Sequence, residues 1–268
     1  MSAEVVSVTV AKPSAPYGHA FGAARRFVDD AAAHVRAIAG AVGATLQELA
    51  GPSATVGAVA AAIRAAAARL YDAPAGLFVL AFAGHGGRLR DRDGDEPDGL
   101  DEAWALDDAP LTDDMLAALL GELHADVHVV LISNCCFAAG VADAVRVASA
   151  ARAADGPPPV RAWPMGSSDA LAVPAALAGE PDTTNRVLIA ACEDDRTIIL
   201  PDSSRLTRRV LDAVFPVQGD VRQRQPVDYA AVEASVRGLA SVSQTPVLVA
   251  TDRDKQRPAF VPQPLRAR

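Results

Sequence analysis

The apolar positions of the chain form short uninterrupted runs that alternate with longer segments of helical spacing. An uninterrupted run such as LFVLAFA at 77–83 is typical of a strand buried on both faces of a sheet, because a strand with one solvated face alternates apolar and polar residues. On this basis strands are predicted at residues 5–11, 44–51, 77–83, 127–133, 186–193 and 245–251. The intervening segments predict helices at residues 20–41, 55–72, 111–124, 142–154, 204–215 and 227–240.

Strands that alternate with helices in this way predict a mostly parallel sheet with helices on both faces. We therefore expect an α/β fold with about six strands, in which 245–251 is an edge strand. No internal repeat and no clear boundary divides the sequence, so residues 1–268 are expected to form a single domain. Ser53 is a candidate N-cap for the second helix. Residues 156–185 form a Pro-rich connection, and connections of that length are usually functional or mobile.

Composition and charge narrow the functional classes. Half of the residues are hydrophobic and only 4% are aromatic, so the core must be built from Ala, Val, Leu and Ile. The net charge of −8 argues against nucleic acid as a partner, because phosphate binding needs a basic face, and it suits a cationic ligand or a metal ion. No apolar run is long enough to span a membrane, and no secretion signal is recognisable, so a cytoplasmic protein is expected.

Two of the predicted strands lead into residues whose side chains could act in catalysis. The run at 77–83 leads into GHGG with His85, and the run at 127–133 leads into NCCFAAG with Cys135 and Cys136. Ligands bind at the carboxyl ends of parallel strands, and a histidine beside a thiol can activate it as a nucleophile. His85 is therefore a candidate partner of Cys135 or Cys136. The difference 136 − 85 = 51 is similar to the separation of about 50 residues in caspases, although the local caspase signature is absent.

The motifs AFAGHGG, DGLDEAW, LTDDML and VVLISNCCFAAG together resemble the caspase-like cysteine peptidases, most closely the metacaspases and their bacterial relatives, the orthocaspases. The helix RFVDDAAAHV and the later segments VLIAACEDDRT and SRLTRRVL extend the resemblance over about residues 5–215. It implies a caspase-like three-layer sandwich and a cysteine endopeptidase that hydrolyses peptides through an acyl-enzyme.

The resemblance also implies roles for individual residues. Cys136 matches the nucleophile and Cys135 its buried neighbour, while His85 would activate the thiol or protonate the leaving group. The backbone N–H groups of Gly86 and Cys136 would form an oxyanion hole. The remaining histidines (His19, His34, His124 and His128) and Cys192 are interpreted as structural. Adjacent cysteines without a second pair do not suggest a zinc site, and the odd count of three suggests a reducing compartment.

Substrate preference in the related enzymes is for Arg or Lys before the cut. Asp30 matches the pocket aspartate on the first helix, but two positions depart from the family pattern. Asn134 replaces the usual Asp, and Ala83 replaces a common Ser. An amide still accepts a hydrogen bond from a guanidinium but gives up the stronger ion pair. Cleavage after Arg or Lys remains the expectation.

Metacaspases commonly bind calcium near the catalytic centre, and four carboxylates match their ligand positions: Asp101, Asp113, Asp114 and Asp143. Calcium takes six to eight oxygen ligands, which clustered aspartates can supply. The resemblance therefore implies calcium as a cofactor, and no organic cofactor is expected.

The function favoured by the sequence is a calcium-dependent cysteine endopeptidase with a peptide or protein substrate, and self-cleavage is expected near 156–185. Nothing in the sequence decides between a monomer and a dimer, and neither nucleic acid nor a membrane is an expected partner. Two alternatives stay open. One is a caspase-like protease with a different preference before the cut that activates another effector. The other is a non-catalytic caspase-like domain that binds a partner and signals.

Overall fold

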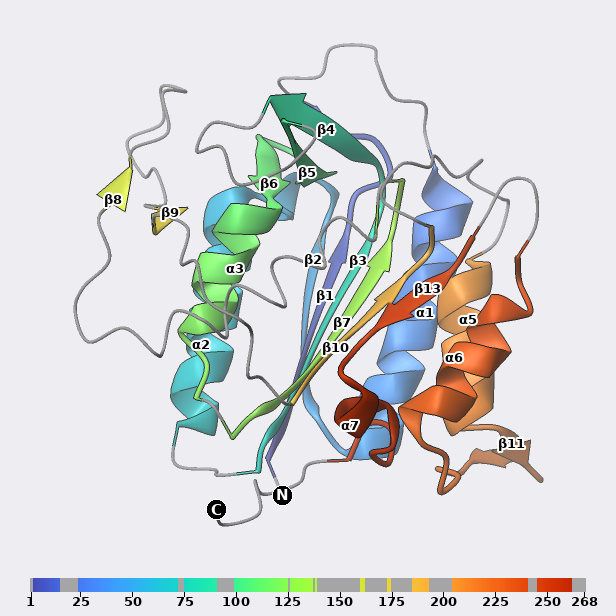
Figure 1. The fold of residues 1–268 in the computed structure, drawn as a ribbon. Coiled ribbons are helices and arrows are strands. Elements are labelled where there is room, and N and C mark those ends of the chain that lie inside the picture. Colours follow the sequence, from blue (N-terminus) through green and yellow to red (C-terminus); the bar gives the residue numbers. More distant parts are fainter. Residues whose placement is uncertain are drawn as a thin grey trace.

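A six-stranded sheet runs through the centre of the molecule, in the order β13-β10-β7-β3-β1-β2 (Figure 1). Its strands are β1 (Ala3–Thr9), β2 (Thr45–Ala50), β3 (Leu77–Ala83), β7 (His128–Asn134), β10 (Arg186–Ala190) and β13 (Val247–Val249). The computed structural model describes residues 2–14, 24–71, 75–90, 99–124, 126–136, 138, 160–161, 173–174, 185–192, 204–240 and 245–261. All neighbouring strands are parallel except β10 and β13, which are antiparallel.

The strands at the centre of the sheet are buried along their whole length, as their uninterrupted apolar sequences predict. β3 occupies 77–83, the range predicted for it, and β13 lies at the edge of the sheet as expected. In β2, at the opposite edge, most residues are at least partly exposed.

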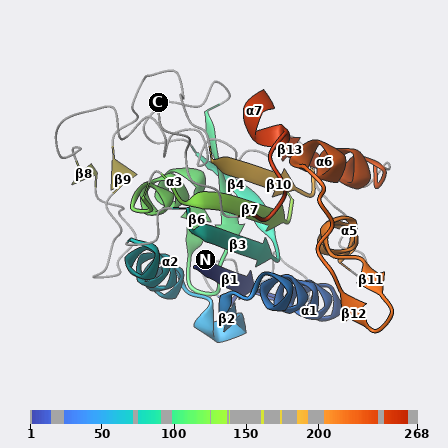
Figure 2. The ribbon, with the colours of Figure 1, turned by 90° about the horizontal axis from the view of Figure 1, so that it is seen from below.

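Helices cover both faces of the sheet, which gives three layers (Figure 2). One face carries α1 (Arg25–Val42), α5 (Arg205–Val214) and α6 (Tyr229–Arg237), and the other carries α2 (Val56–Leu70) and α3 (Asp113–Gly121). The short helices η1 (Gly51–Ser53) and α7 (Asp252–Lys255) complete the described helical segments. This architecture is the mostly parallel α/β sandwich, with helices on both faces of the sheet, that the sequence predicts.

The cap predicted for the second helix is wrong by two residues. Thr55, not Ser53, caps α2, and its hydroxyl accepts a hydrogen bond from the Ala58 N–H at 3.1 Å. The Ser53 hydroxyl instead accepts from the Ala50 N–H at 2.9 Å and closes η1. An insertion of one 3-10 turn after β2 explains the difference, because it moves the start of the helix along the chain.

A second, three-stranded antiparallel sheet, which the sequence did not predict, lies beyond the carboxyl ends of β3 and β7 (Figure 1). It consists of β4 (Gly86–Arg90), β5 (Leu100–Ala105) and β6 (Pro110–Thr112). Short pairs are also formed by β8 (Val160–Arg161) with β9 (Val173–Pro174), and by β11 (Val217–Gln218) with β12 (Val221–Arg222). The helix predicted at 142–154 and most of the connection at 156–185 lie outside the described residues.

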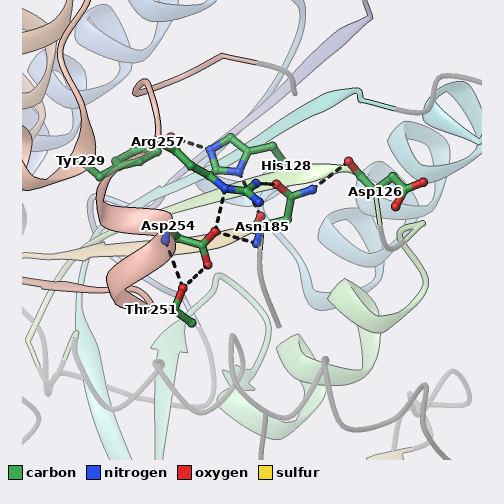
Figure 3. Close-up of polar contacts among 7 residues, drawn as sticks. All are labelled: Asp126, His128, Asn185, Tyr229, Thr251, Asp254 and Arg257. Carbon is green, nitrogen blue, oxygen red and sulfur yellow. Dashed lines mark hydrogen bonds and ion pairs between the residues drawn. The ribbon is translucent and has the colours of Figure 1, made fainter. Parts of the chain in front are cut away.

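The opposite end of the sheet is closed by a buried polar network that involves the segment after β13 (Figure 3). His128 Nε2 lies 2.7 Å from the Tyr229 hydroxyl, and its Nδ1 lies 3.0 Å from the Asn185 carbonyl. The Asp254 carboxylate accepts from the Asn185 N–H at 3.1 Å and pairs with Arg257 at 3.0 Å. Burial lowers the pKa of His128 to about 4, which fits the structural role expected for this histidine. No helix among the described residues is long and apolar enough to cross a membrane.

Candidate active site

The ends of β3 and β7 bring His85 and Cys136 to the same edge of the sheet. Ala83 pairs with Asn134 in the parallel register of the two strands. His85 lies two residues after Ala83, and Cys136 lies two residues after Asn134, so both follow the ends of neighbouring strands. Both residues are partly exposed. The histidine and the thiol that the sequence singled out therefore leave the sheet side by side.

Two glycines flanking His85 allow this close approach. A Cβ atom added at Gly86 would lie 2.0 Å from the Cys136 carbonyl oxygen and 3.0 Å from the Cys135 Sγ. A Cβ added at Gly84 would lie 2.9 Å from the Val10 carbonyl oxygen. Real Cβ atoms essentially never come that close to other atoms, so only glycine fits at these two positions. Gly86 is therefore required by the packing of the His85 turn against the Cys135–Cys136 turn, and Gly84 by its packing against Val10.

The Gly86 N–H is not used in the β4–β5 ladder. Gly86 pairs with Trp104, while the Ala105 N–H donates to the His85 carbonyl at 2.9 Å. In an antiparallel ladder this pattern makes Gly86 and Trp104 a non-hydrogen-bonded pair. The Gly86 N–H consequently points away from β5, an orientation that an oxyanion-hole donor requires.

The three cysteines have different surroundings. Cys135 and Cys192 are buried, with 1% and 0% of their surface exposed, whereas Cys136 is partly exposed. Burial raises the pKa of the Cys135 thiol well above its ordinary value, which makes it a poor nucleophile. The Cys192 Sγ donates to the Cys135 carbonyl oxygen at 3.3 Å. Of the three, Cys136 alone combines access to solvent with a place beside His85.

Trp104 packs against the ends of the two strands that carry the site, and it was not singled out from the sequence. Its side chain is fully buried, its indole N–H donates to the Ser133 hydroxyl at 2.9 Å, and its ring stacks on Phe82 with centroids 4.6 Å apart. The Ser133 hydroxyl also lies 3.4 Å from the Cys135 Sγ. Trp104 therefore connects β5 to residues near the carboxyl ends of both strands that carry the site. A lone tryptophan inside the acidic DGLDEAW segment was the available signal.

An acidic group lies between β5 and the start of α3. Asp101 and Glu102 on β5 are buried, as is Asp113 in the first turn of α3, next to Asp114. Burial raises the pKa of Asp113 to about 9, and the three neighbouring carboxylates add to that rise. The buried Asp113 Oδ1 has no hydrogen-bond partner. Glu102, which sequence reasoning did not name, pairs with Arg88 at 2.9 Å.

These carboxylates suit a hard cation chemically, since calcium prefers oxygen ligands and the buried Asp113 Oδ1 lacks a hydrogen-bond partner. Within the described ranges, no group of three or more His, Cys, Asp and Glu side chains is arranged to hold a metal ion. Asp143, the fourth predicted ligand, lies outside the described residues. The structure brings Asp101, Asp113 and Asp114 into one neighbourhood.

The three residues expected to form the substrate pocket differ in exposure. Asp30 on α1 is partly exposed, whereas Ala83 and Asn134 are 3% and 1% exposed. The Asn134 Nδ2 donates to the Ser204 hydroxyl at 2.7 Å, so this amide is already held by α5. Ser204 was not anticipated, because 70 residues separate it from Asn134.

Comparisons with known proteins support the fold. No protein-family model matches the chain, and no curated protein matches it. Among solved structures, protein GSU0716 from Geobacter sulfurreducens is similar over 98% of this chain and 100% of its own, with 22% identity and a TM-score of 0.66. Caspase-1 from Spodoptera frugiperda is 7% identical, with a TM-score of 0.49, over 92% of this chain and 86% of its own, a likeness too low to support a conclusion. The comparisons thus concern the fold alone.

Proposed function

We propose that the protein is a cysteine endopeptidase in which Cys136 is the nucleophile and His85 the general base and acid. The observation that carries the proposal is the contact between the two turns, in which Gly86 packs directly against the Cys136 carbonyl. A turn that carries only a structural histidine has no need of such an approach. The burial of Cys135 and Cys192 supports Cys136 as the reactive thiol.

The reaction follows from this arrangement. His85 takes the proton of the Cys136 thiol, and the sulfur attacks the peptide carbonyl carbon to give a tetrahedral intermediate. The Gly86 and Cys136 N–H groups donate to the developing oxyanion. His85 then gives the proton to the departing amine, which leaves a thioester. Water, deprotonated by His85, hydrolyses the thioester and restores the thiol.

Calcium dependence and cleavage after Arg or Lys belong to the same proposal. Asp101, Asp113 and Asp114 would hold the ion, together with Asp143 as the resemblance implies. When bound, calcium would supply positive charge that stabilises the ionised form of Asp113 between β5 and α3. Asp30 would provide the charge that selects a basic residue before the cut.

The burial and neutrality of Asn134 and Ala83 favour a second candidate, a protease that cleaves after a small residue. A peptide library randomised at the residue before the cut distinguishes the two. Selection of Arg or Lys supports the first candidate, and selection of small residues supports the second.

Covalent labelling tests the reactive thiol directly. A peptidyl ketone electrophile that carries Arg at its reactive end is incubated with the protein, and the modified residue is located by mass spectrometry. We expect modification of Cys136, loss of labelling in His85→Ala, and no labelling of Cys192. Equal modification of all three cysteines, or labelling that His85→Ala leaves unchanged, contradicts the proposal.

A further inference from the structure

A row of four polar side chains connects the end of β7 to helix α1. The Asn134 Nδ2 donates to the Ser204 hydroxyl at 2.7 Å, Ser204 Oγ lies 2.5 Å from Thr207 Oγ1, and Thr207 Oγ1 lies 2.9 Å from His34 Nδ1. Asn134, Ser204 and Thr207 are at most 1% exposed, whereas His34 is partly exposed. The row therefore leads from a buried position, two residues before Cys136, to a titratable group near solvent.

The Ser204 side chain takes part in this row and does not cap helix α5. It is the N-cap residue of α5, a position at which a serine hydroxyl normally accepts from the backbone of the first turn. Its side chain makes no capping hydrogen bond and instead contacts Asn134 and Thr207. The helix gives up a stabilising interaction, which indicates that the contact with Asn134 is favoured over the cap.

The Asn134 amide sets the first hydrogen bond of the row. An amide NH2 only donates, so the Ser204 oxygen accepts from Asn134. We assign the Ser204 proton to Thr207 and the Thr207 proton to His34 Nδ1, the direction that continues from this first bond. His34 consequently accepts at Nδ1 and is neutral, with its proton on Nε2. In this arrangement every hydroxyl proton has an acceptor, and the Asn134 amide presents its oxygen away from α5.

Protonation of His34 reverses the row. Nδ1–H then donates to Thr207, Thr207 donates to Ser204, and the Ser204 proton needs an acceptor. The Asn134 Oδ1 is that acceptor once the amide rotates by half a turn about its last side-chain bond. The amide now presents its NH2 group, which repels a guanidinium or ammonium group.

We propose that His34 is a positioning residue that selects, through Thr207 and Ser204, which end of the Asn134 amide faces the substrate, so that cleavage after Arg or Lys weakens when His34 takes up a proton. This inference rests on the proposed peptidase function and deepens it.

Four charged groups act on His34 from α1, α5 and β12: Asp30, Arg208, Asp212 and Arg222. Burial is the largest influence and lowers the pKa of His34, and the positive charge of Arg208 acts in the same direction. Asp30 and Asp212 oppose this shift. The neutral form, and with it the acceptor end of Asn134, therefore prevails at neutral pH.

The row is tested first by NMR titration of the labelled protein. The ring nitrogen shifts should show the Nε2–H form of His34 at neutral pH, and the Asn134 side-chain amide signal should move with the midpoint of His34. Thr207→Val, which has nearly the same shape, should abolish that movement while His34 still titrates. A constant Asn134 signal in the wild-type titration overturns the inference, whether or not the protein cleaves peptides.

The effect on cleavage is tested by kcat/KM for an Arg peptide between pH 5 and pH 8. We expect kcat/KM to fall by about tenfold in acid, with the same midpoint as the titration of His34. The fall should come mostly from a higher KM, as expected for the loss of one hydrogen bond to a charged group. His34→Asn keeps an acceptor near the Nδ1 position but does not titrate, and should remove this inflection while any inflection due to His85 stays.

His124→Gln, a substitution at an exposed histidine, is the matched control and should leave the pH profile unchanged. An unchanged acid inflection in His34→Asn overturns the role of His34. Coupled NMR titrations without hydrolysis of any peptide overturn the peptidase function instead, and with it the role in cleavage.

Discussion

Gly86→Ala is expected to separate the two turns of the site. The new Cβ would lie 2.0 Å from the Cys136 carbonyl oxygen, and contacts under 3.0 Å are essentially never observed. The two backbones must therefore move apart by about 1 Å, a displacement that can reduce catalysis by about 10²-fold when it misplaces reacting groups. Overpacking of a tight contact should also lower the free energy of unfolding by ~1–3 kcal/mol.

Gly87→Ala is the matched control, because a Cβ at Gly87 meets no atom within 4 Å. Both variants are compared with wild type by kcat/KM on an Arg peptide and by denaturant unfolding. We expect a large loss of activity for Gly86→Ala and a small change for Gly87→Ala. If Gly86→Ala retains full activity and stability, the close contact between the turns does not exist and the proposed active site is refuted.

Three further results are expected. The pKa of His128 is about 4 in the folded state against 6.5 in the unfolded state, so its contribution to stability is complete above pH 6.5 and is lost as the pH falls through 4. The free energy of unfolding, measured with denaturant, should fall by up to about 3 kcal/mol over this range, and His128→Asn should remove that pH dependence. Asp113→Asn should stabilise the calcium-free protein by ~2–4 kcal/mol at pH 7. Folding must place a proton on Asp113 that the unfolded chain has released, and this cost grows as the pH rises from 3.8 towards 9; in chelator, a wild type as stable to unfolding as the variant argues against the raised pKa. Trp104→Phe should lower the unfolding free energy by ~2 kcal/mol, since Ser133 loses its indole donor, and equal stability of the two proteins in the same assay argues against that contact.

Long uninterrupted apolar runs made the central strands predictable, since burial on both faces imposes a pattern that loops and helices do not share. The β4–β5 hairpin was missed because its strands are rich in charge, and charge is usually read as a solvated loop. One of its charged pairs, Arg88 and Glu102, instead forms an ion pair within the hairpin.

The positions of His85 and Cys136 could be predicted because each follows a strand directly. The support around them could not, because it depends on contacts between distant segments. The His34–Thr207 hydrogen bond joins residues 173 positions apart, and no local pattern in either helix indicates it.

The most direct test of the central claim is hydrolysis of a fluorogenic Arg peptide by wild type, Cys136→Ala and His85→Ala, each with calcium and with chelator. We expect turnover by wild type that both substitutions abolish and that chelator reduces. Turnover that survives Cys136→Ala would contradict the proposed function, as would a wild type that hydrolyses no peptide of a library randomised at the residue before the cut.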